Sequence, residues 1–313
     1  MIASRGLQTI VRWFDSGAAD KADGDPNRVD WLRVLPFVAL HLACFAAYWV
    51  GVSAIAVLVA LLMYLVRMFA ITGFFHRYFS HRAFRTSRSM QLLFAVVGAS
   101  AAQRGPLWWA SHHRHHHLHA DDTQDAHSPH QSGFLWAHAL WFLARRNFAT
   151  RHELVAELAR YPELRFLDRF DVLVPLALAF AMYILGAWLG GAYPELGTGG
   201  WQMLVWGFCI STVALYHATF TVNSLAHSFG RRRYATRDHS RNNWWLAILT
   251  LGEGWHNNHH HYPGAARQGF FWWEIDITYY GLRLLEMAGL VRDLRRVPEA
   301  MLRTRAMPEG SPL

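Results

Sequence analysis

Residues 35–75 read LPFVALHLACFAAYWVGVSAIAVLVALLMYLVRMFAITGFF, an apolar stretch in which Arg67 is the only charged residue. One membrane-spanning helix needs about 20 apolar residues, so this stretch has room for two. Gly51 and Ser53 interrupt the apolar run and mark the turn between them. The sequence therefore predicts a hairpin of two membrane-spanning helices, at about residues 35–50 and 54–75.

Two further apolar stretches follow, at about residues 172–189 and 201–222. A short glycine-rich loop with Pro194 separates them, as expected for a second hairpin. The prediction is an all-α integral membrane protein with four transmembrane helices in two hairpins. Residues 35–297 would form the membrane domain, residues 1–34 an N-terminal segment and residues 298–313 a tail.

Charge indicates the orientation of the chain. The net charge is +8, and it comes from arginine because Lys21 is the only lysine. The arginines lie in the N-terminal segment, between the hairpins and after the second hairpin, whereas the two hairpin loops contain none. The positive-inside rule then places both termini and the central segment in the cytoplasm. We expect a multi-pass protein of the cell (inner) membrane, whose positive charge faces lipid headgroups rather than nucleic acid.

The segments outside the four spans are predicted to form a mostly helical cytoplasmic cap. Residues 134–148 are apolar and aromatic but too short to span a bilayer, so they are expected at the membrane interface. Residues 90–102 are expected at the interface or beneath the cap. Cys44 and Cys209 both lie in apolar stretches, which predicts neither a disulfide nor a thiolate metal site.

Histidines cluster in the predicted cap. Of the 20 histidines, many fall in HRYFSH (76–81), HHRHHH (112–117) and HNNHHH (256–261). Neutral imidazole is a common ligand of transition metals. The spacing H-x-x-H-H places three imidazoles on one helical face. It occurs at His113, His116 and His117, with an alternative register at 112, 115 and 116, and again at His256, His259 and His260. The three clusters are predicted on the same membrane side, where they can converge on one metal site.

The first cluster has a different spacing. His76 and His81 are five residues apart, which places them about 140° apart on an ideal α-helix. Each is therefore expected to serve a different ion, which favours two metals over one. Asn223 and His227, at i and i+4 where the fourth span ends, provide a further ligand position.

The chain resembles the integral-membrane fatty-acyl desaturases, particularly the stearoyl-CoA desaturase branch and its bacterial members. The resemblance rests on HRYFSH (76–81), HRHHH (113–117), NSLAH (223–227) and EGWHNNHH (253–260), which occur in the family's order. The family places arginine directly after the first ligand of the second motif, so Arg114 selects the register that begins at His113. Four motifs in order on four spans form a specific signal.

The resemblance implies a di-iron centre that activates O₂ and removes two hydrogens from an unactivated acyl chain, most often at Δ9. Two electrons must come from outside, because the chain has no CxxC pair and no dinucleotide-binding glycine motif. The donor would be a ferredoxin-, rubredoxin- or cytochrome b5-like protein with its reductase. Asn223 would reach one iron through water. The implied ligands are His76, His81, His113, His116, His117, His227, His256, His259 and His260. Partners of these ligands are expected among Glu253, Asp121, Asp125, His112, His115 and His261.

The acyl carrier is the point where the chain departs from animal members. Those members have arginine and aspartate contacts to coenzyme A where this chain has Ser111 and His112. Acyl-CoA is the expected substrate, with acyl carrier protein or a lipid-bound chain as alternatives.

The alternative functions are a membrane di-iron hydroxylase or alkane monooxygenase and, more weakly, a metal transporter. His41 is expected to be a packed helix residue. Surface or interfacial positions are expected for His127, His130, His138, His152, His217 and His239.

Overall fold

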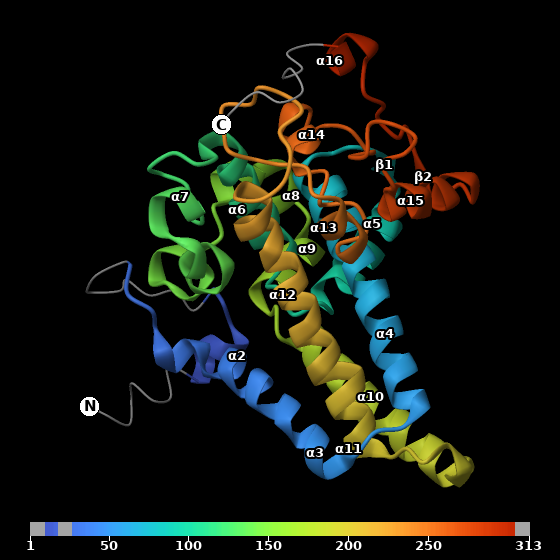
Figure 1. Cartoon of the computed structure of the whole chain (residues 1–313). Helices are drawn as coiled ribbons and strands as arrows, with labels where there is room; N and C mark the ends of the chain where they lie inside the picture. Colours follow the sequence, from blue (N-terminus) through green and yellow to red (C-terminus); the bar gives the residue numbers. More distant parts are fainter. Residues whose placement is uncertain (1–9, 18–26, 304–313) are drawn as a thin grey trace.

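The computed structural model describes residues 10–17 and 27–303, so residues 304–313 of the predicted tail and residues 1–9 and 18–26 of the N-terminal segment lie outside the described residues. Four helical stretches are long and apolar enough to cross a membrane: Arg33–Val50, Ala54–Ser80, Leu173–Ala192 and Gly200–His227. They form two hairpins that rise into a helical cap (Figure 1). The predicted all-α membrane architecture is confirmed.

The first hairpin comprises α2 (Trp31–Ala43), η1 (Cys44–Ala46), α3 (Ala47–Val50), α4 (Ala54–Phe69) and η2 (Ala70–Ser80). The turn falls where the sequence predicts it. Gly51 adopts φ 70°, a conformation that favours glycine, and the Ser53 hydroxyl caps α4 by accepting from the Ala56 N–H at 3.2 Å.

The second hairpin comprises α10 (Leu173–Ala192), η7 (Pro194–Leu196), α11 (Gly200–Met203), η8 (Leu204–Ile210), α12 (Ser211–Ser224) and η9 (Leu225–His227). It packs on the first hairpin through contacts of α4 with η8 and α12. Arg67, the only charged residue of the apolar stretch 35–75, is 1% exposed there and donates to the hydroxyls of Thr212 and Ser211 at 2.6 Å each. These bonds explain how a charged side chain is accommodated between the spans.

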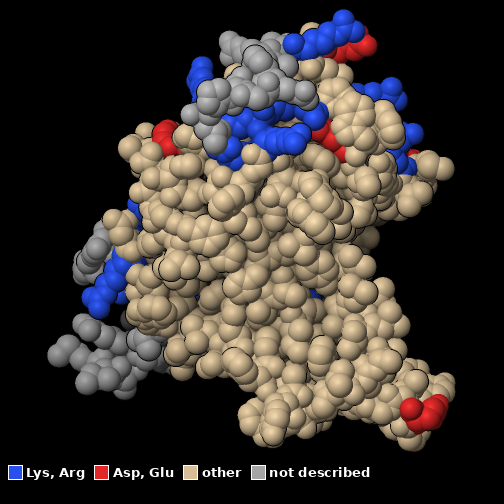
Figure 2. Space-filling view, in the orientation of Figure 1, with Lys and Arg blue, Asp and Glu red and all other residues tan. Residues whose placement is uncertain are grey.

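The cap consists of residues 81–172 and 228–303, and basic side chains gather over it, whereas the surface over the spans is almost free of charge (Figure 2). Cys44 and Cys209 are free thiols, as predicted. Two short strands, β1 (Arg85–Thr86) and β2 (Val291–Arg292), pair antiparallel. The cap helices are α5 (Arg88–Ala99), α6 (Pro106–His119), α7 (Pro129–Ser132), η3 (Trp136–Leu140), η4 (Trp141–Leu143), η5 (Arg145–Asn147), η6 (His152–Val155), α8 (Ala156–Ala159), α9 (Pro162–Arg169), α13 (Trp244–Leu249), α14 (His256–His261), α15 (Ile277–Met287) and α16 (Glu299–Arg303).

Candidate metal centre

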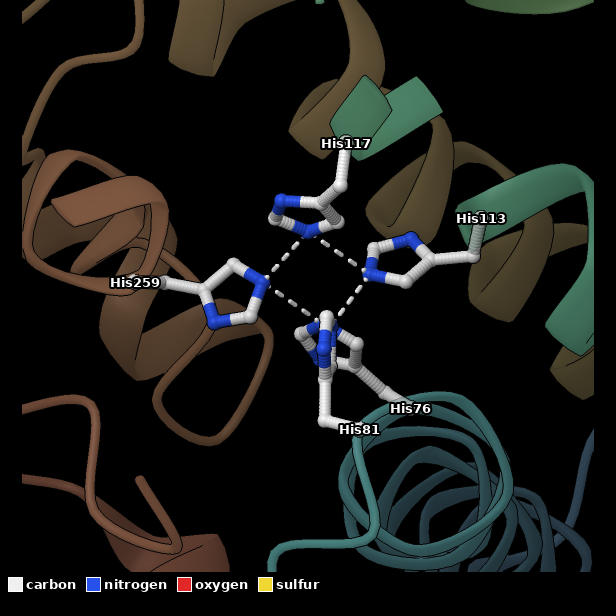
Figure 3. A group of neighbouring side chains, drawn as sticks. All are labelled: His76, His81, His113, His117 and His259. Atoms are coloured by element: carbon white, nitrogen blue, oxygen red, sulfur yellow. Dashed lines mark hydrogen bonds between the residues drawn. The ribbon is translucent and has the colours of Figure 1, made fainter. Parts of the chain in front are cut away.

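Five histidines from three distant parts of the chain converge beneath the cap and form the first ligand group: His76, His81, His113, His117 and His259. They come from η2 and its end, from α6 and from α14 (Figure 3). Neighbouring Nε2 atoms lie 2.7 to 3.0 Å apart around a common point. Two ligands at right angles on an ion, with bonds of about 2.1 Å, would be about 3 Å apart, so this spacing suits one metal ion.

The structure contradicts the expectation that His76 and His81 serve different ions. That expectation assumed a straight α-helix, but Ala70–Ser80 is a π-helix, whose i→i+5 hydrogen bonds bring residues five apart onto one face. The N–H of His81 accordingly donates to the carbonyl of His76 at 3.2 Å, and the two rings are 4.9 Å apart. Both imidazoles therefore join the first ligand group.

Four more histidines form the second ligand group: His116, His227, His256 and His260. The Nε2 atoms of His227 and His256 lie 3.0 Å apart. The Nε2 atom of His260 is buried without a hydrogen-bond partner in the described residues, which leaves its lone pair directed at the group. Each H-x-x-H-H motif is thus divided between the groups, and two sites rather than one are supported.

Carboxylates hold the outer nitrogen of four imidazoles. Because a carboxylate only accepts, each imidazole donates through Nδ1 and leaves the Nε2 lone pair for a metal. His227 donates to Asp121 at 2.8 Å and His116 to Asp125 at 3.1 Å, and Glu253 accepts from His76. The sequence proposed these three acids as partners of the ligands. It missed Asp238, which accepts from His260 at 2.9 Å.

Electrostatics favour the neutral form of three imidazoles in the first ligand group. Burial lowers the pKa of His113, His117 and His259 well below the usual value, and the neighbouring imidazoles lower it further. Burial alone would raise the pKa of Asp238, but the His260 imidazole holds it below the usual range. Neutral imidazoles therefore meet in the first group, and an ionised carboxylate stands behind His260 in the second. This donor set fits two transition-metal ions and does not suit magnesium or calcium, which prefer oxygen ligands.

Other histidines near the clusters occupy different positions. His112, a member of the alternative register, is buried and donates from Nε2 to the carbonyl of Ala149 at 3.1 Å. The ring of His115 contacts the ring of His119 with the centroids 4.6 Å apart, and His261 donates to the carbonyl of Met301 at 2.9 Å. None of the three belongs to the ligand groups found among the described residues.

His127 was expected at the surface, and that expectation is wrong. Its side chain is only 6% exposed, and its ring stacks on His116 with the centroids 4.3 Å apart. Together with Asp125 and His116 it forms a third cluster of possible ligand atoms. No helical spacing relates His127 to the other histidines, because the turn after α6 folds it back. His41 is hydrogen-bonded within its helix, to the carbonyl of Phe37 at 2.8 Å, as expected.

An apolar cavity of about 400 Å³ reaches His113 of the first ligand group. Its walls include Phe37 from α2, Trp141 from η4 and Tyr216 from α12, and its lining also includes Asn223. A second cavity of about 60 Å³ is lined by Ile71 and by members of both ligand groups: His76, His113, His116 and His256. The two cavities share the lining residues Trp109, His113, Thr219 and Asn223. A long apolar ligand could pass directly beside the ligand groups.

The fold and the site together define a class: a membrane protein with two histidine clusters that could hold metal ions beside an apolar cavity. The profile of the fatty acid desaturase family matches residues 51–283. The chain belongs to the fatty acid desaturase family.

Its relatives include acyl-lipid and acyl-CoA desaturases. An sn-2 palmitoyl-lipid 9-desaturase of a Nostoc species is 35% identical, over 90% of this chain and 96% of the relative. Delta-9 acyl-lipid desaturase 1 of Arabidopsis thaliana is 36% identical, over 93% of this chain and 94% of the relative. An acyl-CoA 5-desaturase of Anemone leveillei is also 36% identical, over 86% of this chain and 80% of the relative.

Proposed function

We propose that the protein is an O₂-dependent desaturase that introduces a cis double bond at position 9 of a saturated acyl chain carried by a membrane lipid. The observation that carries this proposal is the apolar cavity that reaches His113 and adjoins a smaller cavity lined by both histidine groups. A methylene group has no polar handle, so its reaction site must be chosen by the shape of such a cavity.

Two iron ions held by the nine histidines, with Asn223 linked through water, would supply the activation of O₂ and the power to oxidise a C–H bond. The residues of the chain position and protect this centre. Asp121, Asp125, Asp238 and Glu253 fix imidazole orientation, and the aromatic cavity wall excludes water from the reacting carbons.

The reaction would consume one O₂, two electrons and two protons for each pair of hydrogens removed from the acyl chain, and would release two waters. The electrons would come from a separate carrier protein, ferredoxin-, rubredoxin- or cytochrome b5-like, with its reductase. The cap and both termini would face the cytoplasm from the inner membrane, as the distribution of arginine predicts.

The carrier of the acyl chain is the part of the expectation that changes. Acyl-CoA was expected first, yet relatives matched over about nine-tenths of this chain are named as acyl-lipid 9-desaturases. An acyl-CoA 5-desaturase is similarly close, so family membership alone does not decide the carrier. Ser111 and His112, which replace the coenzyme A contacts of animal members, favour a lipid-bound chain.

The test compares both carriers in one preparation. The purified protein is placed in lipid nanodiscs that contain isotope-labelled dipalmitoyl phospholipid, or is given labelled palmitoyl-CoA, with a chemical reductant and O₂. We expect a monounsaturated chain in the intact phospholipid, absent from the His116→Ala variant. Unsaturation confined to the CoA ester would overturn the lipid assignment, and a hydroxylated chain would favour the hydroxylase alternative.

A further inference from the structure

A cluster of cations covers the second ligand group. The loop of residues 231–241, here called the arginine loop, carries Arg231, Arg232, Arg233, Arg237 and Arg241, of which Arg233 is paired with Glu274 at 2.8 Å. Arg231 and Arg237 are exposed, and Arg232 shapes the loop by donating to the carbonyls of Thr236 and Asp238 at 2.8 and 2.9 Å. The loop belongs to the basic cap of Figure 2.

The acidic groups of this region point inward, toward the ligands. Asp238, within the arginine loop, is 7% exposed and is bonded to His260. Asp121 lies beneath the loop, where one of its oxygens accepts both from Nδ1 of His227 and from the backbone N–H of His239, at 2.8 Å each. The outer surface therefore keeps the positive charge, while one carboxylate connects the loop to a ligand.

Two exposed imidazoles lie at the same place. The rings of His130 and His239 are in contact, tilted by 32° with their centroids 4.0 Å apart. Nε2 of His130 also bonds to the carbonyl of His227 at 2.9 Å. Each of these surface residues is thus joined to His227 by one or two hydrogen bonds, which makes this a short connection between the surface and the second ligand group.

Burial and neighbouring charge act together on one of these imidazoles. Partial burial lowers the pKa of His239, and the charges of His130, Arg232 and Arg241 lower it further, whereas Asp121 opposes them. The exposed Arg231 and Arg237 beside it favour a negatively charged partner.

We propose that the arginine loop, with His130 and His239 at its centre, is the docking surface of an acidic one-electron carrier protein. This inference rests on the proposed function, which needs two electrons from outside for each double bond. Each docking event would oxidise one reduced carrier and pass one electron toward the ligand group through the His239–Asp121–His227 connection. Two carriers would be oxidised for each O₂ reduced to water.

The experiment uses a [2Fe–2S] ferredoxin of net negative charge and the full-length protein in nanodiscs. Its variants are Arg237→Glu, the double variant Arg231→Glu/Arg237→Glu, and the control Arg165→Glu, an exposed arginine on α9. Each reversal in the arginine loop should raise Kd and KM for ferredoxin about 5-fold at low salt, and the effect should shrink as salt is added. Arg165→Glu should leave both unchanged.

Two further measurements distinguish a failure of this inference from a failure of the proposed function. Product formation driven by dithionite and a small mediator should be the same in all variants, and its absence from the wild type would contradict the desaturase rather than the docking surface. Binding of oxidised ferredoxin is measured without turnover and tests the surface alone. Equal effects of Arg165→Glu and Arg237→Glu would overturn the inference. The inference would also be overturned if the arginine-loop variants kept their ferredoxin binding but lost binding to anionic vesicles. That result would assign the loop to lipid headgroups.

Discussion

Asp238 gives the sharpest test of how the second ligand group is held. Its carboxylate accepts from Nδ1 of His260 at 2.9 Å, and the His260 side chain is 1% exposed. Asp238→Asn keeps an acceptor but removes the charge, so metal affinity should fall about 10-fold, or about 1.4 kcal/mol. Asp238→Ala also leaves the buried N–H of His260 without a partner, so the loss should reach about 100-fold, or about 2.7 kcal/mol.

The assay is chelator competition followed by metal analysis of the purified protein. Asp122→Asn is the matched control, because Asp122 accepts from His119 at 3.1 Å but neither residue belongs to a ligand group. It should keep the wild-type affinity. If Asp238→Ala bound metal as tightly as Asp122→Asn, the claim that Asp238 orients a metal-binding imidazole would be refuted.

Three more predictions follow from the same geometry. His116→Ala should abolish product formation and lower the metal content while the protein stays folded and membrane-inserted, as judged by circular dichroism and size-exclusion chromatography. Burial holds the pKa of His113 well below 6.5, so the unfolded chain binds more protons than the folded chain below that pH. The Tm of the metal-free protein should therefore fall between about pH 7 and about pH 5.5, and a flat profile would contradict this. Gly254→Ala should disrupt the site, because a Cβ there would lie 2.1 Å from the backbone nitrogen of Ala247, whereas Gly191→Ala, with open space around it, should retain metal and activity.

Helical spacing and motif order predicted most of the site. Both H-x-x-H-H motifs lie on helices, α6 and α14, as the i, i+3, i+4 spacing requires. Arg114 selected the register that begins at His113, and His113 lies in the first ligand group while His112 points to a backbone carbonyl. The apolar runs likewise predicted four helices of spanning length. These features depend on residues that are close in the sequence, so they can be predicted from the sequence of one chain.

Two kinds of feature could not be predicted from the sequence: a local departure from α-helix geometry, and a loop that folds back onto the site. A π-helix has i→i+5 hydrogen bonds in place of the i→i+4 bonds of an α-helix, and no residue type in Ala70–Ser80 indicates this difference. Asp238 and His127 reach the centre because loops fold back on it, and no spacing in the sequence records that return. The division of each histidine motif between two groups likewise depends on how α6 and α14 face each other.

The most direct test of the central claim is the fatty-acid profile of a bacterial host without aerobic desaturases that expresses this chain or its His116→Ala variant. Double bonds are placed by mass spectrometry after derivatisation. We predict a new monounsaturated fatty acid with its double bond at carbon 9, present with the wild-type chain and absent with the variant. A hydroxylated product, or the same new fatty acid from both chains, would contradict the account of a histidine-held desaturase centre.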